Sequence, residues 1–458
     1  MTCQPEANES ITIADSHQRR EDVRRLGALF VVGDPFGLAP QRAARVVEFD
    51  TFLHIGRRLP ADPTARAWVV KDQLVSGQHL VIEKEGESYK LTDQGSRNGT
   101  AVDGQLVKEP IKLRDGSIIF FGLQVAVFRT TNEAELAAIR VDLDTPLGPV
   151  PTSSPEFALV CQTLRKLAPS DCEILLTGET GVGKEVYARA VHETSGRTGS
   201  FVAINCAALP RELVESELFG YVRGAHSQAR ESKRGLFEES EGGTLFLDEV
   251  GEMPADLQTK LLRFLQDRLI VPLGSTRARR VDTRVLAATS HTAAPRGAST
   301  VGLRADLAAR LGAEPIRLPP LRHRIEDLGA LIAHFIGPTA HRFDPLAFQA
   351  LALHTWPGNV RELEKVIGNA ELLARDAEAI GLDHLPVAIA DTPSRLRSQS
   401  SGSPRRPPPP SAAELEALLQ RFHGNVLRVA RELGRTPPLI YRWCRRFKLE
   451  PERFRQKD

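Results

Sequence analysis

The chain has 458 residues, of which 41% are hydrophobic and 26% are charged, and its formal net charge is +2. This length suggests two to four domains, and these fractions are typical of a water-soluble globular protein. The longest apolar runs, such as residues 157–160, are too short to cross a bilayer, and the N-terminus lacks the apolar core of a signal peptide. Five cysteines without a C-x-x-C pair predict reduced thiols, so we expect a cytoplasmic protein with no membrane partner.

Positive charge is concentrated at the C-terminal end. From Arg395 to Asp458, fifteen Lys and Arg stand against six Asp and Glu, which gives +9 for this segment and −7 for the rest of the chain. A basic end on a slightly acidic body indicates a nucleic-acid contact confined to that end.

The first 150 residues divide into three segments with different sequence patterns. Residues 1–25 are polar without periodicity, which predicts a disordered tail. Residues 26–130 contain short apolar strands separated by DP, EGE, NG and DG, a spacing that predicts an all-β sandwich or barrel. Residues 131–150 read as a linker.

The second half begins with alternating helices and strands. Residues 151–321 contain the buried-type strands EILLT, FVAIN, TLFLD and RVLAATS with helical segments between them, which predicts an α/β domain with a parallel sheet. Residues 322–390 read as a small helical subdomain, residues 391–411 as a Pro/Ser/Arg-rich linker, and residues 412–458 as a small all-α basic domain.

A phosphate-binding loop is predicted where GETGVGKE follows the strand EILLT and precedes a helix. The segment fits G-x-x-x-x-G-K, in which backbone N–H groups close around phosphates and the lysine reaches the β- and γ-phosphates. An ordinary glycine-rich turn is the alternative. The expected ATP-binding residues are Gly178, Glu179, Thr180, Gly181, Val182, Gly183, Lys184 and Glu185.

An acidic strand end completes the nucleotide signature. In GGTLFLDEV, at residues 242–250, we expect Asp248 to hold Mg²⁺ and Glu249 to polarise the attacking water. Arg304 and Arg310 are either surface-helix residues or, in an oligomeric ATPase, arginines that reach the γ-phosphate of a neighbouring subunit. Arg361 in WPGNVREL stands at a helix start, where it could sense nucleotide.

From about Pro151 to Leu385 the chain resembles the AAA+ domain of bacterial enhancer-binding proteins, the activators of sigma-54 RNA polymerase. The matching segments are GETGVGKE, FVAINCAALP, ESELFGYVRGA, GGTLFLDEVGEMP, LQTKLLRFLQ, LRADLAARL, PIRLPPLRHRIEDL and WPGNVREL. The resemblance implies a homo-oligomer that hydrolyses ATP: a hexameric ring, with a dimer as the alternative for the inactive state.

The same resemblance implies roles for single residues. Asn205 matches the switch residue that restrains Glu249, Arg304 and Arg310 match the trans-acting arginines, and Arg361 matches sensor II. Ser290 occupies the sensor I position, where the family usually has Asn; a hydroxyl can still form a hydrogen bond, so we expect hydrolysis to be retained but slower.

The segment GYVRGAHSQAR, residues 220–230, corresponds to the family's sigma-contacting loop GAFTGA. The matching residues are Gly224, Ala225, His226, Ser227, Gln228 and Ala229. The aromatic residue, the threonine and the second glycine are all replaced. Three hypotheses therefore stay open: an activator of sigma-54 polymerase, a DNA-bound AAA+ regulator that does not engage sigma-54, and a phosphopeptide scaffold with a purely structural nucleotide site.

In the β-domain, IGRR, VSGQH and GSRNGT each lie at a strand–loop junction. Singly they are ordinary turns; together they resemble a forkhead-associated (FHA) domain, which binds phosphothreonine peptides. Arg57 offers a charge-assisted fork to phosphate and Ser76 a hydroxyl donor, while His79 is expected to pack inside. The usual basic residue after the loop serine is Gly77 here. The expected phosphopeptide-binding residues are Arg57, Ser76, Ser96 and Asn98.

The last 47 residues read as helix, short glycine turn and basic helix, the pattern of a helix-turn-helix. They resemble the Fis-type DNA-binding domain that ends enhancer-binding proteins, so upstream promoter DNA is the expected partner. We expect Leu439, Ile440 and Trp443 to pack inside. The candidates for DNA contact are Arg435, Thr436, Tyr441, Arg442, Arg445 and Arg446.

Overall fold

The structure is a computed structural model that describes residues 25–33, 46–58, 60, 66–225, 229–290, 302–312, 314–337, 342–392, 410–422 and separate residues between 429 and 454. The chain divides into two compact units, residues 1–393 and residues 394–458. No helix among the described residues combines the length and apolar character that a bilayer span requires.

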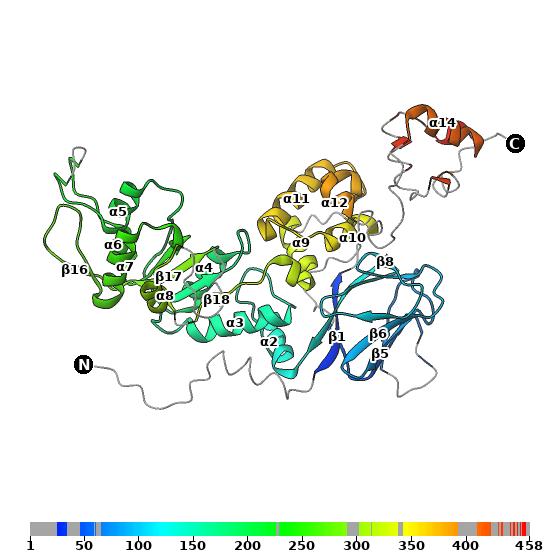
Figure 1. Ribbon diagram of the computed structural model, residues 1–458, viewed down its shortest axis with the longest axis horizontal. Helices are drawn as coiled ribbons and strands as arrows, with labels where there is room; N and C mark the ends of the chain where they lie inside the picture. The colour runs from blue at the N-terminus through cyan, green and yellow to red at the C-terminus, as the bar shows by residue number, and fades with distance from the viewer. Residues whose placement is uncertain are drawn as a thin grey trace. The chain divides into compact units, whose positions relative to one another are not determined.

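The N-terminal β-domain is a sandwich of two sheets, as predicted (Figure 1). One sheet has the order β2-β1-β11-β10-β7-β8 and the other β4-β3-β5-β6-β9. Their facing sides share a core that includes Trp68, Phe121 and Phe128. The strands are β1 (Leu26–Gly33), β2 (Val46–Phe49), β3 (Phe52–Gly56), β4 (Ala67–Val69), β5 (Leu80–Glu85), β6 (Ser88–Asp93), β7 (Thr100–Val102), β8 (Gln105–Leu106), β9 (Ile111–Leu113), β10 (Ile118–Phe121) and β11 (Gln124–Thr131).

The segment 131–150, expected to be a linker, contains the helix α2 (Glu133–Asp144). Asn132 caps it by accepting from the Glu135 backbone N–H, and the Glu135 side chain accepts from the Asn132 N–H. This reciprocal pair satisfies two backbone donors that a helix start otherwise leaves unpaired. The predicted linker thus contains a capped helix over residues 133–144, which the sequence patterns did not indicate.

The α/β part has one five-stranded sheet of order β13-β14-β17-β12-β18, and every neighbouring pair is parallel, as predicted. Parallel strands place their carboxyl ends at one edge, where the nucleotide signatures meet. The strands are β12 (Ile174–Thr177), β13 (Phe201–Asn205), β14 (Thr244–Asp248), β17 (Arg284–Thr289) and β18 (Ile316–Arg317). The helices are α3 (Pro155–Leu167), α4 (Lys184–Thr194), α5 (Arg211–Phe219), α6 (Leu236–Glu239), α7 (Ala255–Asp267) and α8 (Ala305–Leu311), with the short η2 (Val250–Glu252) and the pair β15 (Leu269–Ile270) and β16 (Arg279–Arg280).

The helical subdomain was predicted as helices only, but it also contains the short parallel pair β19 (Arg342–Phe343) and β20 (Ala379–Ile380). Its helices bury Trp356, Phe343 and Phe348 completely. They are α9 (Leu328–Ile336), α10 (Pro345–Leu353), α11 (Asn359–Leu373) and α12 (Val387–Ala390), with the short η3 (Leu321–His323), η4 (Ile325–Asp327) and η5 (Leu382–His384).

The C-terminal unit is described in part. Helix α14 (Ala412–Arg421) begins with a capping pair between Ser411 and Glu414, and η6 (Pro451–Phe454) lies near the end. Ile440 and Trp443 lie in a small buried cluster, so the prediction that they pack inside is confirmed. Leu439 and the six DNA-contact candidates lie outside the described residues: Arg435, Thr436, Tyr441, Arg442, Arg445 and Arg446.

The cysteines that the structure describes are free thiols. Cys161, Cys206 and Cys444 are buried, and Cys172 is exposed. Burial raises the pKa of the Cys206 thiol to about 12, so this thiol stays protonated and unreactive.

Candidate functional site

The phosphate-binding loop connects β12 to α4 and owes its shape to its glycines. Gly181 and Gly183 have φ of 81° and 104°, values that other residues adopt only with strain. A Cβ on Gly181 would also lie 2.4 Å from the Gly358 carbonyl oxygen at the start of α11. The loop therefore fits against the helical subdomain only as glycine.

A cavity of about 870 Å³ opens over this loop. Its walls come from the loop, the ends of β13 and β14, helix α11, and the segment that follows α2. The lining residues that matter here are Thr180, Gly181, Gly183, Lys184, Glu185, Asn205, Asp248, Glu249, Arg361 and the run Pro146, Leu147, Gly148, Pro149. The cavity thus combines phosphate-binding, acidic and apolar walls in a volume suited to a nucleotide.

Three predicted ATP-binding residues do not line the cavity. The Gly178 carbonyl accepts from Lys184 Nζ at 2.9 Å. The Glu179 carboxylate pairs with Arg322, and the Val182 side chain is buried in the core. Such a loop binds phosphate through backbone N–H groups, so its side chains are free for packing, and ATP binding by these three residues stays a prediction.

Lys184 and Glu249 meet at the centre of the cavity wall. Lys184 is 7% exposed, and its Nζ lies 3.6 Å from Glu249 Oε1. The other carboxylate oxygen of Glu249 accepts from the Ser290 N–H at 2.8 Å and from the Ser290 hydroxyl at 2.9 Å. The hydroxyl at position 290 therefore holds one side of Glu249 and leaves Oε1 turned towards Lys184.

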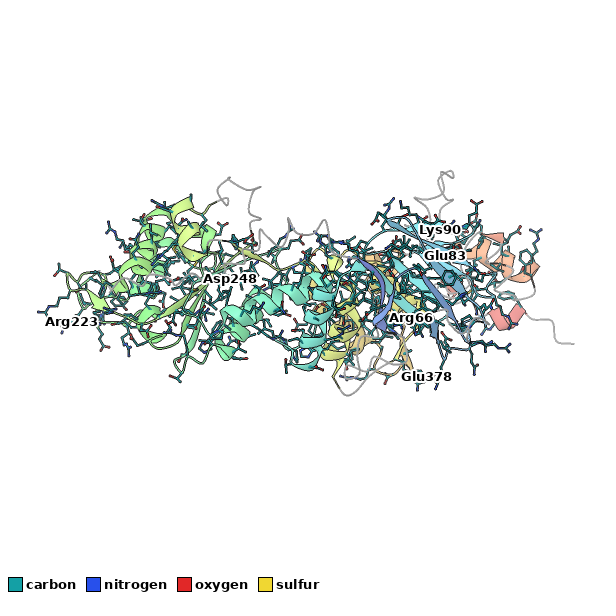
Figure 2. All side chains as sticks on the ribbon, turned by 90° about the horizontal axis from the view of Figure 1, so that it is seen from below. Arg66, Glu83, Lys90, Arg223, Asp248 and Glu378 are labelled. Atoms are coloured by element: carbon teal, nitrogen blue, oxygen red, sulfur yellow. The ribbon has the colours of Figure 1, made fainter. Side chains whose placement is uncertain are left out.

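Asp248 ends β14 beside Glu249, within the α/β part (Figure 2). Its Oδ1 is buried and has no hydrogen-bond partner in the described part of the chain. Burial, and then the charge of Glu249, raises the pKa of this carboxyl. An unpaired buried carboxylate oxygen at the edge of a phosphate cavity suits a divalent cation, which would offset both effects.

Asn205 differs from its expected contact. Its amide nitrogen lies 3.4 Å from Asp248 Oδ2, and its amide oxygen accepts from the Ala207 N–H. Among the described residues it is Ser290 that holds Glu249 here, so a restraint of Glu249 by Asn205 stays a prediction. Asn205 still lines the cavity, next to the two acidic residues.

The helical subdomain reaches the phosphate-binding loop through four residues. Arg361 lines the cavity, as expected for a nucleotide sensor, and its N–H donates to the Gly181 carbonyl. Asn359 donates to Glu179 and to the Thr180 carbonyl. Arg322 forms a two-pronged pair with Glu179 at 2.5 and 2.8 Å, and this pair lowers the pKa of Glu179 to about 2. Arg324 donates to the Val182 carbonyl.

Arg304 and Arg310 stand apart from the cavity. The Arg304 side chain pairs with Asp306 and donates to the Thr259 hydroxyl, and Arg310 donates to the Leu265 carbonyl. Neither is among the described residues that line the cavity of the same chain. An arginine that serves a neighbouring subunit has this placement.

The expected sigma-contacting loop is described only at its base. The Gly224 N–H donates to the Ala229 carbonyl at 2.8 Å, and Arg223 lies at an outer end of the α/β part (Figure 2). His226, Ser227 and Gln228 lie outside the described residues.

The predicted phosphopeptide residues come together at the loops that follow β3, β4 and β6. The Arg57 N–H donates to the Ser76 carbonyl, and the Ser76 Oγ accepts from the Arg97 N–H. Asn98 donates to the Leu74 carbonyl at 2.7 Å, which joins two of these loops. Arg57 and Asn98 are exposed.

Ser96 and His79 have supporting positions here. The Ser96 hydroxyl donates to Asp93 and accepts from the Gly99 N–H, so it is used within its own loop rather than turned towards a peptide. His79 is fully buried, as expected, and burial lowers its pKa. Its Nδ1 accepts from the Ser76 N–H, and its Nε2 lies 3.4 Å from the Gly99 carbonyl.

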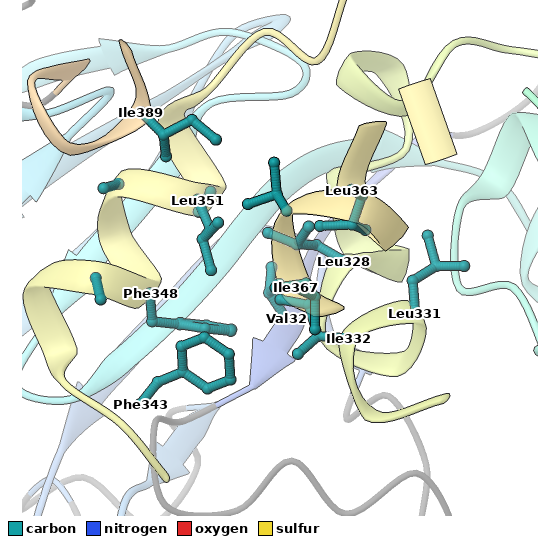
Figure 3. Close-up of a cluster of buried hydrophobic side chains, with 14 of the residues drawn as sticks. Val32, Leu328, Leu331, Ile332, Phe343, Phe348, Leu351, Leu363, Ile367 and Ile389 are labelled. Carbon is teal, nitrogen blue, oxygen red and sulfur yellow. The ribbon is translucent and has the colours of Figure 1, made fainter. Parts of the chain in front are cut away.

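The β-domain also contacts the helical subdomain, which the sequence patterns did not indicate. Val32 and Val127 belong to the same buried cluster as Leu328 and Ile332 of α9 (Figure 3). A Cβ on Gly329 would lie 1.9 Å from the Val32 carbonyl oxygen, so the backbone of α9 approaches β1 directly.

Comparisons with known proteins agree with this division. Residues 150–317 match the Sigma-54 interaction domain family, residues 53–122 the FHA domain family, and residues 322–402 the AAA+ ATPase lid domain family. The central part is thus an AAA+ ATPase domain, preceded by an FHA domain.

Among similar curated proteins, the transcriptional regulatory protein GlrR of Escherichia coli is 38% identical over 67% of this chain and 69% of its own length. The regulator NtrC of Azospirillum brasilense is 42% identical over 58% of this chain and 56% of its own. A protein of Geobacillus stearothermophilus named limonene hydroxylase is 37% identical over 73% of this chain, which spans 63% of that relative. NtrX of Brucella abortus in complex with ATP is 31% identical over 69% of this chain and 73% of its own, with a TM-score of 0.48.

Proposed function

The chain belongs to the family of sigma-54-dependent transcriptional regulators, and on that premise we propose that it is an ATP-hydrolysing DNA-binding regulator controlled by a phosphothreonine ligand of its FHA domain. The observation that supports ATP hydrolysis most directly is the arrangement of Lys184, Asp248 and Glu249 in the cavity lining, with Ser290 bound to Glu249.

Each residue of the proposed hydrolytic site has its own role. Backbone N–H groups of the loop and Lys184 bind the β- and γ-phosphates, where the lysine charge offsets charge that develops on the transferred phosphoryl group. Glu249 accepts a hydrogen bond from the attacking water and orients it, while Ser290 fixes the carboxylate. The apolar run Pro146–Pro149 and Val360 form a wall suited to a purine base.

Mg²⁺ is the proposed metal, and Asp248 is the residue that would hold it, directly or through water. The ion would supply charge stabilisation at the phosphate oxygens. The buried, unpartnered Oδ1 of Asp248 supports this assignment.

Assembly follows from the two arginines that stand outside their own cavity. In a ring, a hexamer, Arg304 and Arg310 of one subunit would reach the γ-phosphate held by the next. Hydrolysis would then require contact between subunits, and loss of the ring would stop it.

Control by the FHA domain is proposed to pass through residues 321–327. This segment contacts the FHA strand β11 through Glu326 and the carbonyl of His323, both bound by Arg129. The same segment holds the phosphate-binding loop through Arg322 and Arg324. A shift of the FHA domain would therefore move the residues that shape the nucleotide site.

A second candidate differs only in the output. The loop sequence GAHSQA lacks the aromatic residue, the threonine and the second glycine of the family's GAFTGA, which favours a DNA-bound AAA+ regulator that does not engage sigma-54 polymerase. In both cases the basic C-terminal domain would bind DNA upstream of a promoter.

The test measures phosphate release and promoter opening with the same full-length protein. We expect Mg²⁺-dependent ATP turnover in the wild type and none in Glu249→Gln, which keeps nucleotide binding because only the water-orienting carboxylate is lost. Absence of turnover at ring-forming concentrations would leave a structural nucleotide site. ATP-dependent open-complex formation with sigma-54 polymerase supports the first candidate, and turnover without it supports the second.

A further inference from the structure

Two consecutive arginines follow β3 and run alongside the loop that carries Ser76. The Arg57 N–H donates to the Ser76 carbonyl at 2.9 Å, and the Arg58 N–H donates to the Gly77 carbonyl at 3.1 Å. A Cβ on Gly56 would lie 2.2 Å from the Gly77 carbonyl oxygen, so the two segments touch backbone to backbone. This contact fixes Arg57 opposite Ser76 and Arg58 opposite Gly77.

The space above Gly77 is occupied by the Arg58 side chain. A Cβ built on Gly77 would lie 3.5 Å from Arg58 Cδ and 3.9 Å from Arg58 Cγ and Nε. These distances are ordinary van der Waals contacts, so the stem of Arg58 passes over the point where a side chain at position 77 would begin. Arg58 therefore brings its guanidinium to the same side of the loop that a basic residue at position 77 would serve.

We propose that Arg58 is a second phosphate-binding arginine of the FHA site, and that it supplies from the segment after β3 the positive charge that Gly77 cannot supply from the serine loop. This inference rests on the proposed phosphothreonine function. The ligand class is a phosphothreonine peptide, whose phosphate carries close to two negative charges and three acceptor oxygens.

The charge balance around the site supports a dianionic ligand. Arg57, Arg58 and Arg97 are exposed, and the described part of the chain gives none of the three an acidic partner. The nearby carboxylate of Asp93 is already bound by Ser96 and Thr100. Backbone hydrogen bonds thus bring three arginines, none with an acidic partner in the described part of the chain, next to Ser76 and Gly77.

The Ser76 hydroxyl can add a hydrogen-bond donor to the three arginines. Its oxygen accepts from the Arg97 N–H at 3.1 Å, which leaves its hydrogen free to donate. Beneath it, the neutral His79 accepts from the Ser76 N–H through Nδ1 and holds the loop. Arg57 and Arg58 would then approach the phosphate from one side and Ser76 from the other.

The test uses full-length protein and fluorescent degenerate peptides of nine residues with a central phosphothreonine, and the same peptides with threonine. Arg58→Ala should weaken binding of the phosphorylated pool about tenfold or more, because charge-assisted contacts to phosphate are the strong ones. The double variant Arg58→Ala with Gly77→Arg should recover most of that loss. Lys90→Ala is the matched control, since Lys90 is a partly exposed cation of the same domain already paired with Glu85.

The outcomes separate the inference from the function on which it rests. If the wild type does not prefer the phosphorylated pool, the phosphothreonine function itself fails. If the wild type prefers it and Arg57→Ala abolishes the preference while Arg58→Ala leaves affinity unchanged, Arg58 is a surface residue and the inference is overturned. Failure of Gly77→Arg to rescue would show that Arg58 does not replace that position.

Discussion

Arg129 in the last strand of the FHA domain forms a two-pronged ion pair with Glu326 at the start of the AAA+ lid. Glu326 is fully buried and Arg129 is 15% exposed. Burial alone would lower the pKa of Arg129, but the charges of Glu326 and Asp115 outweigh it and raise this pKa. Arg129 therefore keeps its charge at every physiological pH, and its pair with Glu326 is a fixed element of the contact between the two domains.

The first prediction concerns this pair. Arg129→Ala leaves a buried carboxylate without a partner, a change that typically costs about 3–5 kcal/mol. We expect a clear fall in the thermal midpoint of unfolding. The double variant Arg129→Met with Glu326→Met should regain most of the stability, because no buried charge remains, yet it should lose any effect of phosphopeptide on ATP turnover.

The matched control is Arg140→Ala, which removes an exposed arginine paired with Glu48 and Glu133. Exposed pairs contribute roughly 0–1 kcal/mol, so its midpoint should change little. An unchanged phosphopeptide response in the double Met variant would show that control does not pass through residues 321–327.

The second prediction concerns Ser290. Removing its hydroxyl in Ser290→Ala leaves Glu249 with only the backbone N–H at that position. A hydrogen bond to a charged group contributes roughly 1.5–3 kcal/mol, so we expect ATP turnover to fall about tenfold or more at unchanged nucleotide affinity. Ser290→Asn, which restores a donor, should recover activity. Equal turnover in wild type and Ser290→Ala would mean that the hydroxyl does not position Glu249.

Local patterns predicted some of these features and missed others. The phosphate-binding loop and the Asp-Glu end of a strand each need particular residues at fixed spacing, so both could be predicted from the sequence together with the strand or helix next to them. Helix α2 was missed although Asn132 and Glu135 form a capping pair that the sequence shows. The Asn205 partner and the Arg129–Glu326 pair could not be predicted, because both depend on how segments far apart in the chain pack together.

The third prediction concerns the buried carboxyl of Asp327. It accepts from the Thr152 hydroxyl and from the Ser153 N–H, and burial raises its pKa from 3.8 to about 7 against the opposing charge of Arg324. Between these two pH values the folded protein retains a proton that the unfolded chain has lost. The contribution of Asp327 to stability is therefore largest below about pH 4 and falls as pH rises towards 7.

Asp327→Asn keeps an acceptor at this site without an ionisable group. The difference in thermal midpoint between wild type and variant should therefore shift in favour of the variant as pH rises from about 4 to 7. Midpoints recorded at half-unit steps would test this, and a difference independent of pH would show that Asp327 ionises as an ordinary aspartate.

The fourth prediction concerns the ring. Lys184→Ala cannot bind the phosphates properly, and Arg304→Ala cannot supply the arginine to its neighbour, so each variant alone should be inactive. Mixed together, some neighbouring pairs contain an intact Lys184 site beside an intact Arg304, and part of the ATP turnover should return. No recovery at any mixing ratio would show that Lys184 and Arg304 act on the nucleotide site of the same subunit.

The last prediction concerns the loop that reads GAHSQA. Its base is closed by the Gly224 N–H and the Ala229 carbonyl, and Gly274 of the neighbouring loop lies so close that a Cβ there would be 2.8 Å from the Ala225 Cβ. The two arms of the loop are therefore held together at their base. The tip lacks the phenylalanine of the family, and burial of one such ring contributes roughly 1.5–3 kcal/mol, of which a neutral histidine recovers only a part.

Gln228 adds a side chain that must be ordered where the family has glycine. We therefore expect weak or no sigma-54 contact in the wild type and a stronger contact in the triple variant His226→Phe, Ser227→Thr, Gln228→Gly. ATP turnover should change little, because Gly224 and Ala229, which flank these residues, are not among the described residues that line the nucleotide cavity. Binding of fluorescent sigma-54 in the presence of a transition-state analogue of ATP measures the contact directly. Strong ATP-dependent binding by the unmodified loop would show that the aromatic tip is dispensable in this protein.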